Sequence, residues 1–165
     1  MGDKPLVSII MGSANDWEVM QQSARALQDF GVAYDARVIS AHRSPDLLLD
    51  YIRKISAQGV QCFIAGAGGA AHLAGVIAAT TTLPVLGVPI PSKYLKGMDS
   101  LLSIVQMPKG IPVATFAIGE AGAANAGLFA VSMLALSDPA LVDKLATYRQ
   151  KQAEQIATTT LPDLH

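Results

Sequence analysis

The chain has 165 residues, of which 51% are hydrophobic and 15% are charged, with a formal net charge of −1. This balance excludes a disordered or fibrous protein, and the length suffices for one domain with a sizeable core. The near-neutral charge and the lack of a basic run argue against a nucleic-acid partner held through its phosphates.

Strand-like and helix-like segments alternate along the chain and are bounded by turn or capping residues. In chain order we predict a strand at 6–11, a helix at 16–30, a strand at 32–39, a helix at 45–58, a strand at 60–65, a helix that follows the Gly-rich turn 66–69 and ends at 79, a strand at 85–88, a helix at 99–106, a strand at 113–116, a helix at 121–135 and a last helix from 139.

This alternation predicts an α/β fold with a central parallel sheet and helices on both faces, in a single domain over 1–165. The ordered core and the C-terminal helix are expected to span about 6–157, followed by a loose tail over 158–165. Leu141, Leu145 and Tyr148 mark the apolar side of the last helix. Its polar continuation over 150–156 either reaches a neighbouring subunit or frays.

The chain shows no targeting or membrane segment. The apolar run 6–11 is too short for a signal-peptide core and lacks a basic flank. Pro84, Pro89 and Pro91 interrupt the longest uncharged region, which argues against a membrane span. We therefore expect a cytoplasmic protein with no membrane partner.

Long stretches of the chain carry almost no charge. None occurs between Lys54 and Lys93, and from Gly110 to Ser137 only Glu120 is charged. Exposed surface normally carries charged side chains, so these tracts predict burial beyond the core of one subunit. We expect a homo-oligomer with extensive apolar interfaces. The alternative is a monomer whose parallel sheet is well buried.

Three loops with unusual sequences follow three of the predicted strands: 12–16, 40–43 and 66–72. The carboxyl ends of parallel strands lie at one edge of a sheet, where ligands of such folds bind. We therefore predict that the three loops meet in one cleft.

The second loop, Ser40–Pro45, carries the most informative chemistry. Ser44 is a candidate N-cap and Pro45 a candidate first helical residue, so the loop opens a helix whose free N–H groups favour anions. Arg43 adds a cationic fork suited to phosphate, and His42 can exchange a proton near neutral pH. The segment predicts a site that holds a phosphate and moves a proton on the same ligand.

The other two loops suit a sugar and a flat ring. Gly12 and Ser13 offer donors to an anion, while the Asp16 carboxylate suits ribose hydroxyls; ordinary helix capping is the alternative for Ser13 and Asp16. In the third loop, glycines would let a planar heterocycle or a carboxylate approach the backbone. The functional and structural interpretations of His72 are equally balanced.

Other site classes fit poorly. The Gly-rich loop lacks the Gly-Lys-Ser/Thr ending of a phosphate loop and follows the third strand, not the first, which excludes triphosphate hydrolysis and NAD binding as primary interpretations. His42 and His72 have no further ligand at zinc spacing, and no nucleophile elbow is present. Cys62 is alone in an apolar run, which excludes an internal disulfide and favours a buried structural thiol.

Four segments together resemble the class I N5-carboxyaminoimidazole ribonucleotide mutases of purine biosynthesis, a family formerly described as the catalytic subunit of phosphoribosylaminoimidazole carboxylase. The segments are Gly12–Trp17, Ser40–Pro45, Gly66–Leu73 and Ser100–Pro108, and the resemblance runs from Val7 to about Tyr148. It implies a flavodoxin-like three-layer αβα sandwich assembled as an octamer. It also implies a carboxylate shift within one ribonucleotide, from the exocyclic nitrogen to a ring carbon, without ATP, metal or another cofactor.

The resemblance also assigns roles to residues. His42 is the implied proton-transfer residue. The implied substrate-binding residues are Ser13, Asp16 and Arg43, helped by Gly12, Ser40, Gly68, Gly69, Ala70, His72 and Leu73. Asn15 stands where the family usually has Ser, and Ala74 where it usually has Pro; these departures bear on affinity more than on the proposed base.

Two alternatives remain at this stage. The class II relatives carboxylate aminoimidazole ribonucleotide with free CO2, although the stretch Gly69–Leu73 favours class I. A non-catalytic flavodoxin-like module that binds FMN is the other, but the chain lacks the aromatic pair expected to sandwich a flavin.

Overall fold

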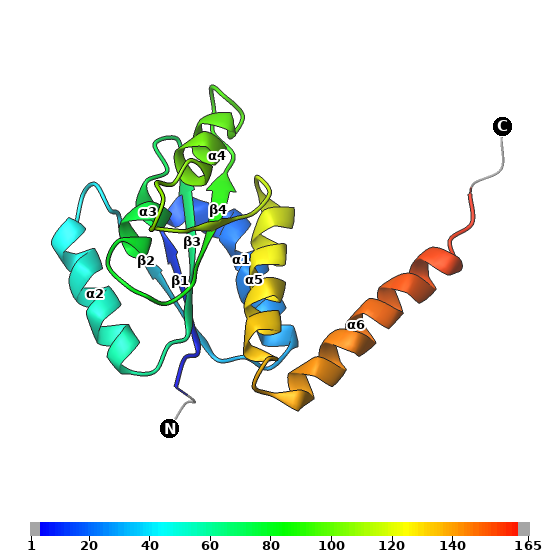
Figure 1. The fold of residues 1–165 in the computed structure, drawn as a ribbon. Coiled ribbons are helices and arrows are strands. Elements are labelled where there is room, and N and C mark those ends of the chain that lie inside the picture. The colour runs from blue at the N-terminus through cyan, green and yellow to red at the C-terminus, as the bar shows by residue number, and fades with distance from the viewer. Residues whose placement is uncertain (1–3, 162–165) are drawn as a thin grey trace.

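The computed structural model describes residues 4–161. Five strands form one parallel sheet in the order β2-β1-β3-β4-β5 (Figure 1). The strands are β1 Val7–Met11, β2 Tyr34–Val38, β3 Cys62–Gly68, β4 Val85–Ile90 and β5 Ala114–Thr115. The helices are a 3-10 turn at Ala14–Asp16, then α1 Trp17–Asp29, α2 Pro45–Ala57, α3 Leu73–Ala78, α4 Met98–Val105, α5 Glu120–Leu134 and α6 Pro139–Ala157.

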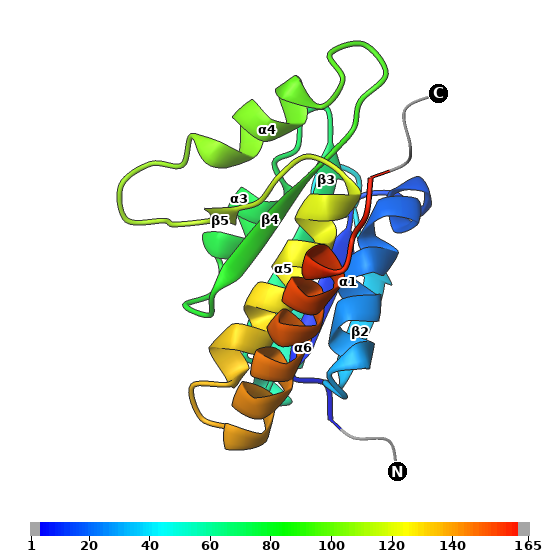
Figure 2. The same cartoon turned by 90° about the vertical axis from the view of Figure 1, so that its right-hand side faces the viewer.

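The sheet is the middle layer of three. On one face α1 and α5 run side by side, and their buried side chains share one core cluster with β1, β3 and β4 (Figure 2). On the other face α2, α3 and α4 share a second cluster with the same sheet. The predicted three-layer α/β fold is confirmed, and the strand order is that of flavodoxin-like proteins.

Small residues set the spacing between α1 and α5. A Cβ added at Gly127 of α5 would lie 2.8 Å from the Ala26 Cβ and 2.8 Å from the Ser23 carbonyl oxygen, both on α1. The two helices therefore approach at a distance that only glycine allows at this position. This accounts for the Ala- and Gly-rich sequence over 121–135 as helix packing within one subunit.

Two strands are longer than their sequences indicated. We expected a turn at 66–69, but β3 continues to Gly68, because residues 66–68 pair with 88–90 of β4. Gly66 faces Met20 of α1, and a Cβ there would clash with the Met20 side chain. β4 continues through Pro89 to Ile90. Pro89 has no N–H to donate, but its nitrogen faces the β5 side of the strand, and the pairing with β5 ends at Gly87. The proline therefore removes no hydrogen bond from the sheet.

The helix α6 leaves the sandwich at its first turns and extends away from it as an arm (Figure 1). Asp138 caps it by accepting the Ala140 N–H at 3.0 Å, as predicted. Leu141 is buried and the Tyr148 ring meets Phe30 edge-on with ring centroids 5.7 Å apart, but residues 149–161 are all exposed.

The polar continuation over 150–156 is helical, and all of its residues are exposed. Of the predicted loose tail, 158–161 is exposed and 162–165 lies outside the described residues. Within residues 4–161, no helix combines the length and the apolar character that a membrane crossing requires.

The switch in strand order determines where a ligand can enter. From β1 the chain first adds β2 on one side and then β3 on the other, so the crevice lies beyond the carboxyl ends of β1 and β3. The three loops singled out in the sequence follow β1, β2 and β3 at this edge.

Candidate functional site

A cavity of about 570 Å³ lies at the carboxyl edge of the sheet. All three predicted loops line it, together with the end of β4. The lining residues are Gly12, Ser13, Asn15, Asp16, Ser40, Ala41, His42, Arg43, Ala67, Gly68, Gly69, Ala70, Leu73, Ile90, Pro91 and Ser92. The predicted convergence of the loops is confirmed: every predicted site residue except His72 lines this cavity.

The first loop is a capping box. The Ser13 N–H donates to Asp16 Oδ2 at 3.0 Å, and the Asn15 N–H donates to Ser13 Oγ at 3.3 Å. The capping interpretation of Ser13 and Asp16 therefore holds, and both side chains still line the cavity. Burial raises the pKa of Asp16 above its ordinary value, while backbone donors at Ser13 and Gly12 and the charge of Arg43 oppose the rise.

Arg43 joins the first two loops. Its Nη2 donates to the Gly12 carbonyl oxygen at 2.9 Å, and its Nε and backbone N–H both lie within 3.3 Å of Ser40 Oγ. These contacts fix the guanidinium at the mouth of the cavity. Within residues 4–161, Nη1 donates to no protein acceptor and remains available to an anion.

The start of α2 differs in one detail from its sequence prediction. Pro45 is the first helical residue, as predicted. Ser44 precedes it, but its hydroxyl donates to the Ser40 carbonyl oxygen at 3.0 Å and makes no capping bond. The serine therefore closes the Ser40–Ser44 turn and leaves the first helical N–H groups without a side-chain acceptor.

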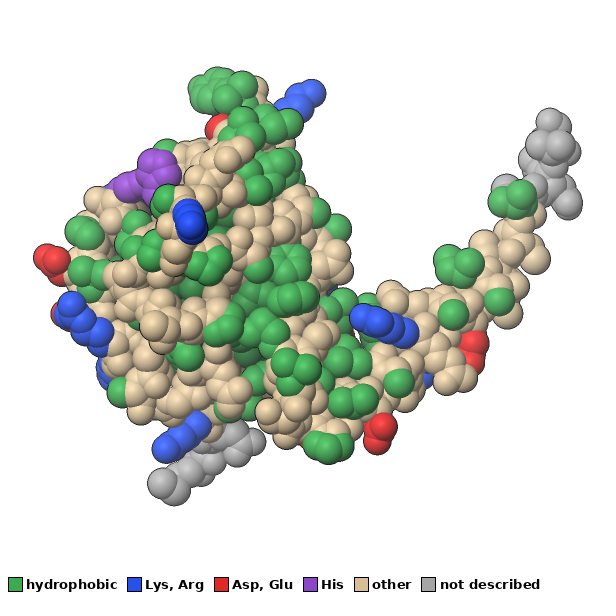
Figure 3. Space-filling view, viewed as in Figure 1, with side chains coloured by type: hydrophobic (Ala, Val, Ile, Leu, Met, Phe, Trp, Pro, Cys, Tyr) green, Lys and Arg blue, Asp and Glu red, His purple; other side chains and the backbone are tan. Residues whose placement is uncertain are grey.

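The two histidines contact each other across the cleft. His42 Nε2 lies 2.9 Å from His72 Nδ1, and the rings meet at 88° with centroids 5.0 Å apart. Both side chains are exposed and form one patch on the surface (Figure 3). His72 thus touches the imidazole of His42 and is not among the residues that line the cavity. Among the described residues His42 Nδ1 has no protein partner.

The third loop presents its backbone to the cavity. Gly68 and Ala70 are exposed, Gly69 is half-buried with φ +67°, and the Leu73 side chain is buried at the start of α3. The positive φ at Gly69 turns the chain sharply as it leaves β3, so that peptide groups instead of side chains face the ligand space.

The sequence prediction missed the fourth side of the cavity, which Ile90, Pro91 and Ser92 form. The signal that could have found them is topological: β4 is parallel to β3, so its carboxyl end must reach the same edge. Ser92 Oγ bonds Asp99 Oδ1 at 2.5 Å and accepts the Gly97 N–H at 3.0 Å, which ties this side to the start of α4.

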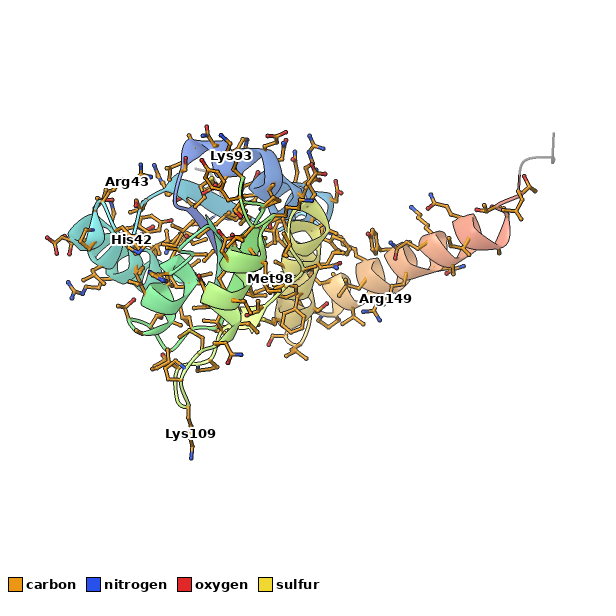
Figure 4. All side chains as sticks on the ribbon, turned by 90° about the horizontal axis from the view of Figure 1, so that it is seen from above. His42, Arg43, Lys93, Met98, Lys109 and Arg149 are labelled. Carbon is orange, nitrogen blue, oxygen red and sulfur yellow. The ribbon has the colours of Figure 1, made fainter. Side chains whose placement is uncertain are left out.

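Two other observations bear on the choice of site. A larger groove of about 1060 Å³, lined by 80–84 and 110–112, lies at the opposite edge of the sheet, where its one ionisable lining residue is Arg53. Figure 4 shows that Lys109 and Arg149 point away from His42 and Arg43. The strand-end cavity is therefore the one that combines an arginine, a carboxylate and an imidazole. No group of three or more metal-ligating side chains occurs within residues 4–161.

Comparison with known proteins agrees with this architecture. A family model described as AIR carboxylase matches residues 6–155. The chain belongs to the AIR carboxylase family. A Vibrio parahaemolyticus protein named N5-carboxyaminoimidazole ribonucleotide mutase is 55% identical over 94% of this chain and 97% of its own length. A protein of the same name from Saccharolobus solfataricus is 51% identical over 95% and 98%.

The fold has a matching relative among solved structures. The crystal structure of Treponema denticola PurE superposes with a TM-score of 0.85 at 28% identity, covering 93% of this chain and 94% of that one. The resemblance stated from the sequence is confirmed, and the chain is an enzyme of this family.

Proposed function

We propose that this enzyme converts N5-carboxyaminoimidazole ribonucleotide to 4-carboxy-5-aminoimidazole ribonucleotide in cytoplasmic purine biosynthesis. The observation that carries the proposal is the single cavity in which Arg43, Asp16 and His42 meet. The names of relatives that are 51–56% identical over nearly the whole chain support the mutase activity over carboxylation with free CO2.

Each charged group has a role that its surroundings favour. Arg43 is held by Gly12 and Ser40 and offers Nη1 to the phosphate of the ribonucleotide. Asp16 would repel a phosphate, but its oxygens can accept hydrogen bonds from ribose hydroxyls. Burial raises the pKa of Asp16, and donors from the ribose hydroxyls would favour its ionised form.

The imidazole ring of the nucleotide is proposed to lie against the third loop. Gly68, Gly69 and Ala70 present backbone groups with no bulky side chain, so a flat ring and its carboxylate can approach closely. With Arg43 fixing the phosphate at one end, the reacting atoms are confined beside His42.

His42 is proposed to move one proton twice. It protonates the exocyclic nitrogen as the N–C bond of the carbamate breaks, which releases CO2 within the cavity. The ring carbon then attacks that CO2 to form the new C–C bond, and His42 removes the proton from this carbon. The proton balance is zero, because the same imidazole gives and regains one proton.

His72 has a positioning role in this scheme. Its contact with His42 Nε2 leaves Nδ1 of His42 for the substrate and fixes the plane of that ring. The apolar part of the cavity lining, made of Ala, Leu, Ile and Pro residues, would together with the bound nucleotide limit the escape of CO2 and the entry of bulk water.

The proposed assembly is a homo-octamer. Its support is the amount of apolar surface that one chain leaves exposed. The exposed large hydrophobic side chains include Tyr94, Leu95, Met98, Leu102, Val105, Phe129 and Leu136. Met98, Leu102 and Val105 of these lie together on α4, and a contiguous exposed apolar patch is typical of a protein–protein interface. Light scattering that gives a stable monomer at micromolar concentration would refute the assembly.

The decisive test of the activity offers two substrates to the purified enzyme separately. Faster turnover of N5-carboxyaminoimidazole ribonucleotide is expected. Faster turnover of aminoimidazole ribonucleotide with bicarbonate would replace the mutase assignment with the carboxylase, and a yellow protein with bound FMN and no turnover would replace both.

Variants separate binding from chemistry. His42→Asn should keep ribonucleotide affinity and lose about 10²- to 10⁴-fold in kcat, the range of general acid–base catalysis. Arg43→Ala should mainly weaken binding. Arg53→Ala is the matched control, since Arg53 is an exposed arginine on α2 outside the cavity. Near-normal turnover of His42→Asn, or unchanged affinity of Arg43→Ala, would remove that residue from its role.

A further inference from the structure

A buried serine on α4 holds the third loop from behind. Ser100 is 0% exposed, and its Oγ accepts the Gly69 N–H at 2.9 Å while donating to the Ile90 carbonyl oxygen at 2.7 Å. The Ser100 hydroxyl is therefore both a donor and an acceptor, and the two hydrogen bonds fix its orientation. It joins α4 to the ends of β3 and β4, the two strands that border the cavity.

The Gly69 peptide needs such a partner. Its φ of +67° lies in a region that glycine enters as readily as others, so the backbone has no strong preference for the observed conformation. No atom beyond the two neighbouring residues lies within 4 Å of the position where a Gly69 Cβ would be, so this side of the residue is open. Among the described residues, Ser100 Oγ is the one acceptor of the Gly69 N–H, so this hydrogen bond favours the observed conformation.

The conformation of Gly69 is passed along the loop to His72. The Gly69 carbonyl oxygen accepts the Ala71 N–H at 2.9 Å, and the Ala70 carbonyl oxygen accepts the His72 N–H at 2.8 Å. These two tight turns lead directly to the imidazole that contacts His42. A rotated Gly69 peptide would move both the backbone facing the ligand and His72.

A second serine of α4 adds a weaker contact. Ser103 Oγ lies 3.3 Å from the Gly69 carbonyl oxygen but 2.7 Å from the Asp99 carbonyl oxygen of its own helix. Its one proton is shared unequally, so the bond within the helix is the stronger. Ser103 is therefore expected to matter less than Ser100.

We infer that Ser100 is a positioning residue that fixes the Gly69 peptide and, through it, His72 against His42. Ser100 is outside the cavity lining and does not touch the substrate. The inference rests on the proposed function for its kinetic readout, and hydrogen exchange provides a readout that does not.

The kinetic test compares Ser100→Ala with Ser103→Ala and a matched control. Ser23→Ala is the control, because Ser23 is also 0% exposed and donates to a carbonyl oxygen, that of Ala123 at 2.6 Å, between α1 and α5. Ser100→Ala should lose about ten- to a hundred-fold in kcat/KM, mostly in kcat, because misplaced groups cost rate. Ser103→Ala should lose about threefold or less, and Ser23→Ala should stay within about twofold.

The second readout is amide hydrogen exchange of the peptide covering 66–73. Exchange there should be faster in Ser100→Ala and unchanged in Ser23→Ala. Ser100→Cys keeps the size of the side chain with a weak acceptor and tests the same bond where the alanine variant fails to fold. Wild-type exchange and wild-type kinetics in either Ser100 variant would overturn the inference, as would an equal kinetic loss in Ser23→Ala. If wild-type enzyme turns over neither ribonucleotide, the proposed function fails while the exchange result still decides the role of Ser100.

Discussion

Tyr51 connects α2 to the first two strands of the sheet. Its hydroxyl lies 2.7 Å from Ser8 Oγ on β1 and donates to Asp35 Oδ2 on β2 at 2.8 Å. Ser8 is 0% exposed, so Tyr51→Phe leaves the Ser8 hydroxyl buried without a partner, at a cost of about 1–3 kcal/mol. The lost bond to Asp35 adds about 1 kcal/mol, a discounted figure because Arg37 still holds that carboxylate, whose side chain is 25% exposed.

The expected loss for Tyr51→Phe is therefore about 2–4 kcal/mol of unfolding free energy. Ser8→Ala alone should cost about 1 kcal/mol, since Tyr51 keeps Asp35. In the double variant no hydroxyl is stranded, so the loss should be smaller than the sum of the single losses by about 1–2 kcal/mol. Urea unfolding of the four proteins at one protein concentration measures this cycle. Losses that add to within about 0.5 kcal/mol would refute the network.

The same cycle has a signature at high pH. Burial raises the pKa of Tyr51 to about 12 from its ordinary value of 10.0. A raised phenol pKa means that the folded state favours the neutral form of Tyr51. The stability that Tyr51 contributes is therefore complete below its ordinary pKa and is lost as pH rises toward its raised pKa. The stability gap between wild type and Tyr51→Phe should therefore narrow across that interval.

Three further predictions follow from burial and packing. Asp16→Asn should match or exceed the melting temperature of the wild type at pH 7, because a raised carboxyl pKa means that ionisation of Asp16 costs stability. Calorimetry should show the difference in melting temperature closing as pH falls through the raised pKa of Asp16, and the affinity for the nucleotide should drop. Gly127→Ala gains about 1 kcal/mol in helix propensity but forces a Cβ to 2.8 Å from Ala26, so urea unfolding should report a net loss of about 1 kcal/mol. Cys62 is 0% exposed and burial raises its pKa to about 12, so a thiol reagent at pH 8 should label it only after denaturation.

The fold could be predicted from the sequence because its signals are local. Apolar runs, periodic helices and caps such as Asp138 specify each element with little help from the rest of the chain. The element ends were harder, because tertiary contacts decide them. Gly66 looks like a turn residue in the sequence, but the Met20 side chain lies against it and requires a strand without a Cβ.

The part of the candidate site that lies on the three strand-end loops could be predicted from the sequence. His42, Arg43 and Asp16 were predicted to lie together because they are ionisable side chains that follow predicted strands, and all three line the cavity. The contact between His42 and His72 was not predicted, because no sequence pattern shows that two histidines 30 positions apart bring Nε2 of one within 2.9 Å of Nδ1 of the other. The segment Ser100–Pro108 contributed to the resemblance, but no role was predicted for Ser100, because a buried serine on a helix has no pattern that distinguishes support of a loop from ordinary packing.

The helix α4 links the site to the proposed assembly. Its inward side carries Ser100 and the buried Ile104, while Met98, Leu102 and Val105 on its outward side are 52%, 53% and 46% exposed. These three side chains recur at helical spacing, so they form one apolar stripe that no other part of the described chain covers. A second subunit packed on the stripe would bury it and hold α4 against β4. The Ser100 bond would then transmit that constraint to Gly69, so assembly and ordering of the catalytic loop would share one element.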